Sequence, residues 1–363
     1  MATAGASDGQ WAKLKEKALP RLAISLLLGA GFVWLFRRGG LPLLPQGAAL
    51  SAMRGWAFPT YLVVSWLAAY FRTWRWVHLL RPIAPRVNPF RVLGIGFVGY
   101  AAVFLSPLRM GEVVRPYLLS RDRQISFFQG LGTVGAERVI DGLILTLLSF
   151  CALTIAPKVS PLPNRLGNLP IPVAAVPAAL YSTLLLFAGA FAAIAIFYRA
   201  RAWARWVMEL TVAKISRPLS DWMTATLERL ADGLSFLPSW HHFSRFLRDT
   251  ALYWLLSVGA QWLLLRGVGL HASIAEACVT IGVMGLGTLI PSGPGFFGAY
   301  QISAFTALAL FYPVPAVLSQ GAAFVFIAYC VQLSTNVLSL VPGFLLMRRF
   351  PAQASAGSAQ VEP

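Results

Sequence analysis

Long apolar runs without any charged residue, separated by short clusters of arginine, dominate the pattern of this chain. A helix needs about 20 residues to cross the hydrocarbon core of a bilayer. The last run has no Asp, Glu, Lys or Arg over 71 residues, enough for roughly three passes. The runs cover residues 22–36, 55–71, 92–108, 142–156, 171–197, 250–265 and 277–347. This pattern predicts an all-α integral membrane protein, a polytopic helical bundle of roughly seven to nine segments.

Composition supports this class and limits the partners. Hydrophobic residues make up 57% of the chain and charged residues 12%, with a mean hydropathy of +0.67, whereas about 25% of a soluble domain is charged. The 30 Lys and Arg exceed the 13 Asp and Glu, which gives a net charge of +17. These positive residues flank apolar runs and form no soluble basic domain, so we expect no nucleic-acid partner. Attraction to anionic membrane lipids explains the surplus better.

The three cysteines and four histidines indicate neither a metal site nor a cofactor. Cys151, Cys278 and Cys330 each lie in an uncharged run, which is typical of small packing residues. His241 and His242 are adjacent and would therefore point to different faces of a helix. We predict no cofactor, no metal and no disulfide framework.

A broken element around residues 106–117 interrupts the third apolar run with a proline, a glycine and three charges. Pro107 would end the preceding helix, and Gly111 would permit a new one to start, over residues 111–119. Arg109, Glu112 and Arg115 follow at positions i, i+3 and i+6 and would share one face of that helix. Charges in an apolar chain are costly and usually belong to a functional site, and broken helices in membrane proteins bind polar substrates.

A second broken element, around residues 291–298, repeats the spacing of the first. Leu, Pro and Gly occur at the same intervals in 105–111 and in 289–295, which is typical of an inverted repeat with a site between its halves. Two ordinary kinked spans are the alternative. The second break carries no charge, so it would contribute exposed backbone N–H groups and close helix approach. Its candidate site residues are Pro291, Gly293, Gly295, Gly298 and Gln301.

The positive-inside rule suggests how these breaks lie in the membrane. If residues 92–106 crossed completely, the five arginines between positions 109 and 138 would lie outside. A re-entrant hairpin entered from the cytoplasm avoids this, and the second break would then be a hairpin entered from the outer side. Both termini would be cytoplasmic.

The same charge pattern predicts five sections of chain. Ser126 is the expected N-cap of a short amphipathic helix, three residues before Gln129, and Glu137 to Asp141 lead into the run at 142–156. The sections are a cytoplasmic N-terminal segment (1–18), a first membrane half (19–197), a basic amphipathic cytoplasmic linker (198–249), a second membrane half (250–347) and a disordered cytoplasmic tail (348–363).

Arginine suits phosphate recognition because its guanidinium group binds two phosphate oxygens at once. Arg109 and Arg115, close to a helix N-terminus at Gly111, therefore indicate a site for an anionic lipid headgroup. Glu112 would hold an arginine in place or carry a proton. The alternative is a buried ion-pair network that only locks the hairpin.

Glu137, Arg138 and Asp141 form a second cluster, with two acids against one arginine. The spare negative charge could accept Arg109 or Arg115 across the fold. The alternative is the start of an interfacial helix with capping acids. No Walker-type phosphate loop and no hydrolytic arrangement of residues is present, so we predict neither an ATP site nor an enzyme.

Three stretches resemble the lysylphosphatidylglycerol synthase transmembrane region, or flippase-like, family. They are Pro-x-Arg-x-Gly-Glu-x-x-Arg at 107–115, Glu-Arg-x-x-Asp at 137–141, and residues 291–301. The resemblance extends over roughly residues 20 to 345. The family usually has Pro-Gly-Gly-x-Gly-x-x-Glu in the last stretch, whereas here Gln301 replaces the acid, which puts a proton-carrying role there in doubt.

The resemblance implies a multi-pass protein of the bacterial plasma membrane that moves a phospholipid, or a polyprenyl or hopanoid lipid, between leaflets. The aminoacyltransferase domain of bifunctional members is not expected, because little chain follows the last span. Other hypotheses are a non-catalytic subunit partnering a lipid- or glycan-modifying enzyme, a small-anion secondary transporter, and a lipid transferase with Glu112 or Asp141 as base. A homo-oligomer is left open.

Overall fold

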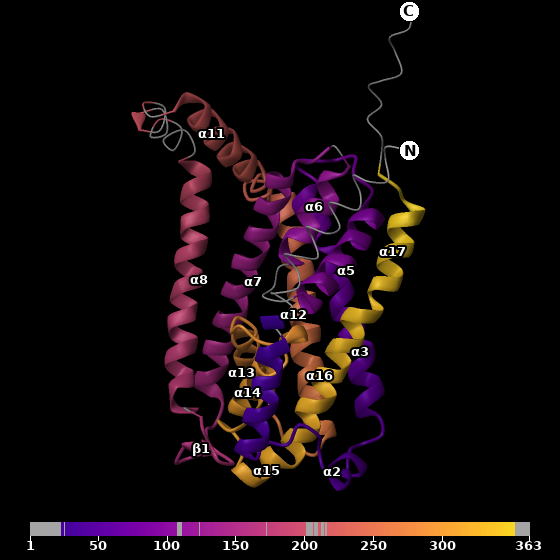
Figure 1. Cartoon of the computed structure of the whole chain (residues 1–363), viewed down its shortest axis with the longest axis vertical. Coiled ribbons are helices and arrows are strands. Elements are labelled where there is room, and N and C mark those ends of the chain that lie inside the picture. The colour runs from indigo at the N-terminus through magenta and orange to yellow at the C-terminus, as the bar shows by residue number, and fades with distance from the viewer. Residues whose placement is uncertain are drawn as a thin grey trace, which may run out of the picture.

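The protein forms a bundle of α-helices with almost no β-structure (Figure 1). The computed structural model describes residues 23–24, 26–106, 111–122, 124–171, 173–200, 206, 210–211, 214 and 216–352. Within these ranges, three helical stretches are long and apolar enough to cross a membrane: Phe127–Ile155, Val173–Arg199 and Val314–Arg349. The prediction of an all-α membrane protein is confirmed at this level.

In the first half, α7 packs against α8, α6 and α4. A helical stretch over residues 23–39 precedes them, with residue 25 not described. The elements are α2 (Gly47–Ser51), α3 (Ala57–Trp74), α4 (Trp76–Leu80), α5 (Pro89–Leu105), α6 (Val114–Ser120), α7 (Phe127–Ile155), a two-stranded hairpin of β1 (Arg165–Leu166) and β2 (Leu169–Pro170), the 3-10 turn η2 (Val173–Ala175) and α8 (Val176–Arg199).

The second half supplies the remaining helices. They are α11 (Arg217–Asp232), α12 (Trp240–Gly267), α13 (Ile274–Gly287), the 3-10 turn η3 (Pro294–Phe296), α14 (Ala299–Leu308), α15 (Val314–Leu318), α16 (Gln320–Leu338) and α17 (Leu340–Arg349). The two halves interlock, because α12 packs along α3, α17 along α5, and α13 along α7.

Helix α7 begins as expected and then continues further than expected. The Ser126 hydroxyl group accepts a hydrogen bond from the backbone N–H of Gln129, and the Gln129 side-chain oxygen accepts one from the backbone N–H of Ser126, so the predicted N-cap is confirmed. The prediction that this helix is short is wrong, because it runs unbroken for 29 residues through the charged cluster at 137–141. Partners from other helices neutralise these charges, which is why the helix does not need to end there.

The section boundary predicted at 249/250 falls inside a helix. Helix α12 starts at Trp240, so its first ten residues belong to a section that the sequence assigned to the linker. Arg348 and Arg349 likewise lie on α17 and not in the tail. Residues 1–18 and 353–363 lie outside the described ranges.

The two broken elements meet inside the bundle. Helix α5 ends at Leu105, and the Phe104 ring contacts the Phe296 ring of the second break edge-on, at 5.5 Å between centroids. Gly295, with φ 70°, lies so close that an added Cβ would be 3.1 Å from the Phe104 ring. Ser106 and residues 290–293 line a small cavity of about 100 Å³ between them.

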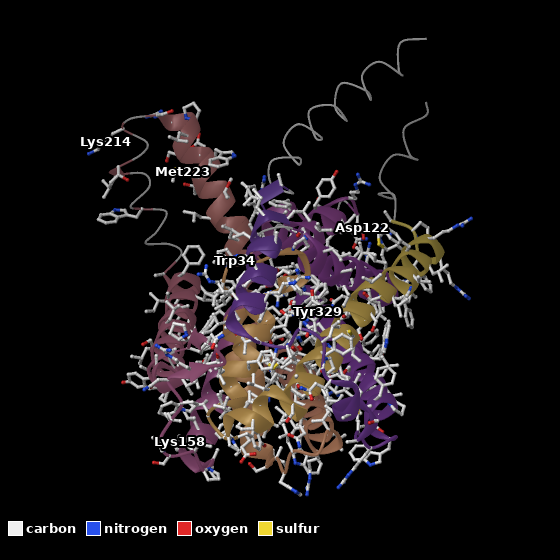
Figure 2. All side chains as sticks on the ribbon, turned by 60° about the horizontal axis from the view of Figure 1, so that its bottom comes forward. Trp34, Asp122, Lys158, Lys214, Met223 and Tyr329 are labelled. Carbon is white, nitrogen blue, oxygen red and sulfur yellow. The ribbon has the colours of Figure 1, made fainter. Side chains whose placement is uncertain are left out.

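Different elements lie at the two ends of the bundle. Helices α6, α11 and the end of α17 lie at one end, and β1, α2 and α15 lie at the other (Figure 1). Lys158 projects from the second end, and Asp122 lies at the first (Figure 2). The cavity described next opens between these ends.

Candidate functional site: a charged ring beside an internal cavity

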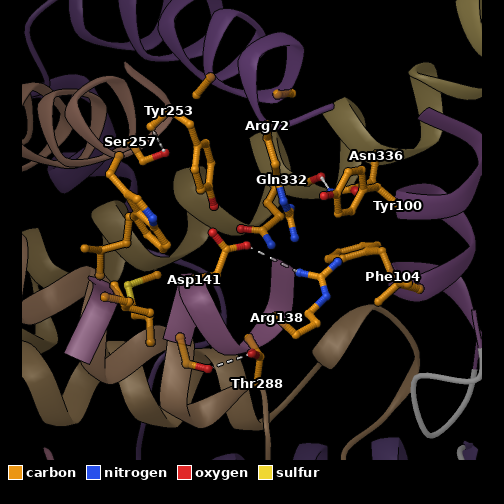
Figure 3. Close-up of a pocket in the computed structure, with 18 of the residues that line it drawn as sticks. Arg72, Tyr100, Phe104, Arg138, Asp141, Tyr253, Ser257, Thr288, Gln332 and Asn336 are labelled. Carbon is orange, nitrogen blue, oxygen red and sulfur yellow. Dashed lines mark hydrogen bonds and ion pairs between the residues drawn. The ribbon is translucent and has the colours of Figure 1, made fainter. Parts of the chain in front are cut away.

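A cavity of about 670 Å³ lies among α3, α5, α7, α12, α13, α14 and α16. Most of its lining is apolar, with Phe97, Phe104, Leu145 and Phe187 among the wall residues. Charged and polar side chains gather on one part of the wall, where Arg72 and Arg138 approach each other (Figure 3). The cavity therefore combines a large apolar surface with a localised cationic patch.

Six alternating charges form a closed circuit behind this patch, and we call it the charged ring. The loop before α6 and α6 itself supply two members, α7 supplies three, and the residue after α3 supplies the last. The nitrogen–oxygen distances around the ring are 3.2 Å for Arg138–Glu112, 3.9 Å for Arg138–Asp141, 2.5 Å for Arg75–Asp141, 3.0 Å for Arg75–Glu137, 2.8 Å for Arg115–Glu137 and 3.9 Å for Arg115–Glu112. Three acids balance three arginines.

Arg75 is the member of the ring that connects Asp141 and Glu137, and it is completely buried. It donates two hydrogen bonds to Asp141, at 2.6 and 2.5 Å, and one to Glu137 at 3.0 Å. A fourth bond, of 3.2 Å, goes to the hydroxyl of Thr250 on α12. Paired, hydrogen-bonded charges are the arrangement in which ions tolerate burial, and this arginine thus joins α3, α7 and α12.

Arg115 pairs with Glu137, which confirms one of the two ion pairs expected for the spare acid. Both side chains are fully buried and neither lines the cavity. Tyr100 on α5 donates its hydroxyl hydrogen to Glu137 and accepts a bond of 3.3 Å from Arg115. Arg115 therefore joins α6 to α7 through a buried ion pair.

Arg138 is the ring arginine that faces the cavity. Its Nε donates to Glu112 at 3.2 Å, and Asp141 lies 3.9 Å from Nη1 on the other side (Figure 3). Its Nη2 is buried and has no hydrogen-bond partner among the described residues. A guanidinium group held by two carboxylates, with one nitrogen unused, is prepared to donate to a further acceptor.

Arg72 adds a cation that is outside the ring. Its guanidinium carbon lies 4.0 Å from the centroid of Tyr100 and 5.8 Å from that of Tyr253. The Nε atom is buried without a hydrogen-bond partner, and no acid lies within ion-pair distance, both within the described part of the chain. Aromatic faces on α5 and α12 therefore hold a positive charge at the cavity wall.

The structure places the predicted site residues in several different positions. Glu112, Arg138 and Asp141 line the cavity, whereas Arg115 and Glu137 lie behind it. Pro291 and Gly293 line the small cavity between the two breaks. Arg109 lies outside the described residues.

The remaining predicted glycines have packing roles. An added Cβ on Gly111 would lie 2.2 Å from the backbone of Ala102, which shows how closely the chain after the break returns along α5. Gly295 and Gly298 adopt φ angles of 70° and 96°, in the region that favours glycine. Gln301 accepts a 2.7 Å hydrogen bond from the N–H of Gly298 and so caps α14.

Sequence reasoning missed Arg72, Arg75, Tyr100 and Tyr253. The two arginines follow an apolar run and begin an arginine-rich stretch, a pattern that is typical of a cytoplasmic helix end. Their i, i+3 spacing at the end of an apolar run placed both on one face, and that was the available signal. The side-chain partners of Arg75 lie 62 or more residues away in the sequence, and no local pattern could indicate them.

No group of three or more His, Cys, Asp or Glu side chains that could hold a metal ion occurs in the part of the chain that the structure describes. The described residues of the site offer hydrogen bonding and charge, from guanidinium groups that are held in fixed positions beside an apolar space.

Of three comparisons with known proteins, only the one with protein-family models gives a match. No significant match was found among curated proteins or among solved structures. The family model for the lysylphosphatidylglycerol synthase TM region matches residues 22–343, nearly the whole chain. The departure at Gln301 does not prevent this match. The chain belongs to the lysylphosphatidylglycerol synthase TM region family.

Proposed function

We propose that the protein is a lipid translocase, not driven by ATP, that binds an anionic lipid headgroup in the cavity. One observation carries the proposal: a largely apolar cavity has two arginines on its wall, each with a buried nitrogen that lacks a described partner. Acyl chains suit the apolar wall, and a phosphate suits the guanidinium groups. A small anion would use only the cationic patch and would leave the apolar surface without a function.

In this proposal Arg138 and Arg72 contact the phosphate. Glu112 and Asp141 position Arg138, while Tyr100 positions Arg72. Arg115 and Glu137, which are buried behind the wall, stabilise the supporting structure. The capture role expected for Arg115 thus passes to Arg138, because Arg138 lines the cavity and Arg115 does not.

The two broken elements support movement of a lipid through the centre of the bundle. Helix α6 returns along α5, since Gly99 and Gly111 contact Arg115 and Ala102 respectively. Helix α14 likewise returns along α13, where Gly287 meets Ser303. We propose that both pairs are re-entrant hairpins, entered from opposite sides and meeting at Phe104 and Phe296. This arrangement would place the site near the middle of the bilayer.

The proposed orientation follows from charge. The end of the bundle that carries α6, α11 and the end of α17 is rich in arginine, so we assign it to the cytoplasm of a bacterial plasma membrane. Both termini would then be cytoplasmic.

A transport assay tests the proposal. The purified protein is reconstituted into liposomes with fluorescent phosphatidylglycerol, and the fraction reachable by an external quencher is followed over time. Arg138→Gln should reduce the rate at least tenfold, whereas Arg349→Gln, at the exposed end of α17, should have no effect. Equal rates for Arg138→Gln and the unmodified protein would exclude the proposed role of Arg138. Absence of movement, together with a stoichiometric partner enzyme on purification, would favour an accessory subunit.

A further inference from the structure

A second set of polar side chains, outside the charged ring, lines the cavity and carries no charge. Four side chains contribute: Trp254 and Gln261 on α12, Tyr300 on α14 and Thr335 on α16, all lining the cavity. They are buried, with exposed fractions of 6%, 7%, 2% and 7%. The indole Nε1, the amide Oε1 and the two hydroxyl groups have no hydrogen-bond partner among the described residues.

These atoms are unusual because buried polar groups normally find partners. The Gln261 amide nitrogen donates to Tyr61 on α3, at 3.5 Å, and Tyr61 and Tyr300 belong to the same buried cluster and line the same cavity. Gln261, Tyr300 and Tyr61 therefore form a group, which we call the neutral subsite. A buried polar group that stays unpaired costs about 1–3 kcal/mol.

The neutral subsite is separate from the cationic patch. Tyr61 precedes Arg72 by eleven residues on α3, which corresponds to about 16 Å along the helix axis. Gln261 follows Tyr253 by eight residues on α12, or about 12 Å. A phosphate on Arg72 or Arg138 therefore leaves the neutral subsite open to another part of the headgroup, or to the same headgroup at a later position.

The donor and acceptor types define what would bind. Gln261 offers an acceptor, Trp254 offers only a donor, and the hydroxyl groups of Tyr300 and Thr335 offer both. An ionised phosphodiester has no hydrogen to donate to the amide oxygen. An ammonium group has no acceptor for the indole N–H. A hydroxyl group both donates and accepts, so a group with several hydroxyls can bond to both members of the neutral subsite that have an atom without a described partner, Gln261 and Tyr300.

We infer that the cavity contains a subsite for the neutral polyol of a lipid headgroup, such as a glycerol or a ring with several hydroxyls. The inference rests on the proposed translocase function and adds a preference among anionic lipids. Hydroxyl-bearing phosphodiester lipids would be favoured over lipids of equal charge that lack hydroxyls.

The test compares three lipids with the same acyl chains and the same single negative charge: phosphatidylglycerol, phosphatidylinositol and phosphatidylpropanol. The last differs from phosphatidylglycerol only by two hydroxyl groups. Rates are measured in proteoliposomes, and lipid binding is measured separately by native mass spectrometry. We expect at least one polyol lipid to be preferred roughly tenfold over phosphatidylpropanol, the factor that one or two neutral hydrogen bonds provide.

The variants are Tyr300→Phe and Gln261→Leu, with Tyr181→Phe on the exposed face of α8 as the matched control. Both subsite variants should bring the preference close to one by slowing only the polyol lipids, and Tyr181→Phe should leave it at tenfold. If glycerol and ring lipids differ, the faster one identifies the polyol.

Equal rates and equal binding for the three lipids would overturn the inference, because the polar atoms would then serve only to hold water. That result would leave the translocase proposal intact. Binding preference without movement of any lipid would have the opposite meaning: the subsite would stand and the translocase function would fail.

Discussion

The guanidinium group of Arg72 lies over the ring of Tyr100, 4.0 Å from its centroid. The same ring has Arg115 at 4.4 Å and Arg138 at 5.3 Å, and its hydroxyl group donates to Glu137. Tyr100 therefore joins the cation outside the charged ring to the ring itself. Its aromatic face and its hydroxyl group have different tasks, which can be separated by substitution.

Tyr100→Phe removes the hydroxyl group and keeps the face. The loss of a hydrogen bond to a buried carboxylate should lower the free energy of unfolding by about 1.5–3 kcal/mol, while Arg72 keeps its aromatic support. Tyr100→Leu removes both and should also slow lipid movement well below the rate of Tyr100→Phe. Thermal unfolding in detergent and the liposome assay measure the two effects. Equal transport rates in the two variants would rule out a role for the aromatic face.

Arg75→Met should destabilise the protein severely. The substitution leaves Glu137 and Asp141 with fewer partners in the interior, and breaking a buried ion pair on one side typically lowers stability by about 3–5 kcal/mol. Arg86→Gln, at an exposed position, is the control and should unfold like the unmodified protein. Combining Arg75→Met with Asp141→Leu should recover part of the loss, because fewer charges then remain unpaired. A normal unfolding temperature for Arg75→Met alone would contradict the ring as a stabilising structure.

Gly111→Ala should disturb the first break. Its new methyl group would lie 2.2 Å from the backbone of Ala102, and backbone cannot move aside cheaply, so we expect a loss of about 1–3 kcal/mol. Gly189→Ala on α8 has no atom within 4 Å of the new methyl group and should instead gain up to about 1 kcal/mol. Chemical or thermal unfolding of both variants tests the difference. A stable Gly111→Ala protein would show that the hairpin is less tightly packed.

Topology can be tested with single cysteines in a protein whose three native cysteines are replaced. Lys158 lies at one end of the bundle (Figure 2), and Arg349 is the last residue of α17, which ends at the other (Figure 1), so the variants are Lys158→Cys and Arg349→Cys. An impermeant thiol reagent added to intact cells should label position 158, and position 349 should react only after lysis. Labelling of both positions in intact cells would contradict the proposed orientation.

Local sequence patterns predicted what is local in this structure. The apolar runs identified the class, Ser126 and Gln129 identified a helix start, and Pro107 indicated the region where α5 ends. The Arg115–Glu137 pair was among the two pairings expected, because an unbalanced acid in an apolar environment must find a cation. These inferences depend on short-range geometry or on a charge requirement that the sequence displays directly.

Arg75 could not be identified in the same way. An arginine beside a run of further arginines has the pattern of a cytoplasmic boundary, yet this one is completely buried. Its partners come from α7 and α12, and only the packing of these helices on α3 brings them together. The continuous α7 has the same explanation, because charges at its centre are compatible with a helix only when distant residues neutralise them.

The charged ring determines which parts of the protein can separate. Pulling α6 from α7 would break the fully buried ion pair of Arg115 and Glu137, so we expect these helices to move as one unit. Phe104 and Phe296 touch through their aromatic rings, so separating them breaks an apolar contact and no ion pair. Phe296 also has a left-handed φ of 59°, an unfavourable conformation for a bulky residue. If the cavity opens alternately to the two leaflets, the gate lies at this aromatic contact and not at the ion pairs.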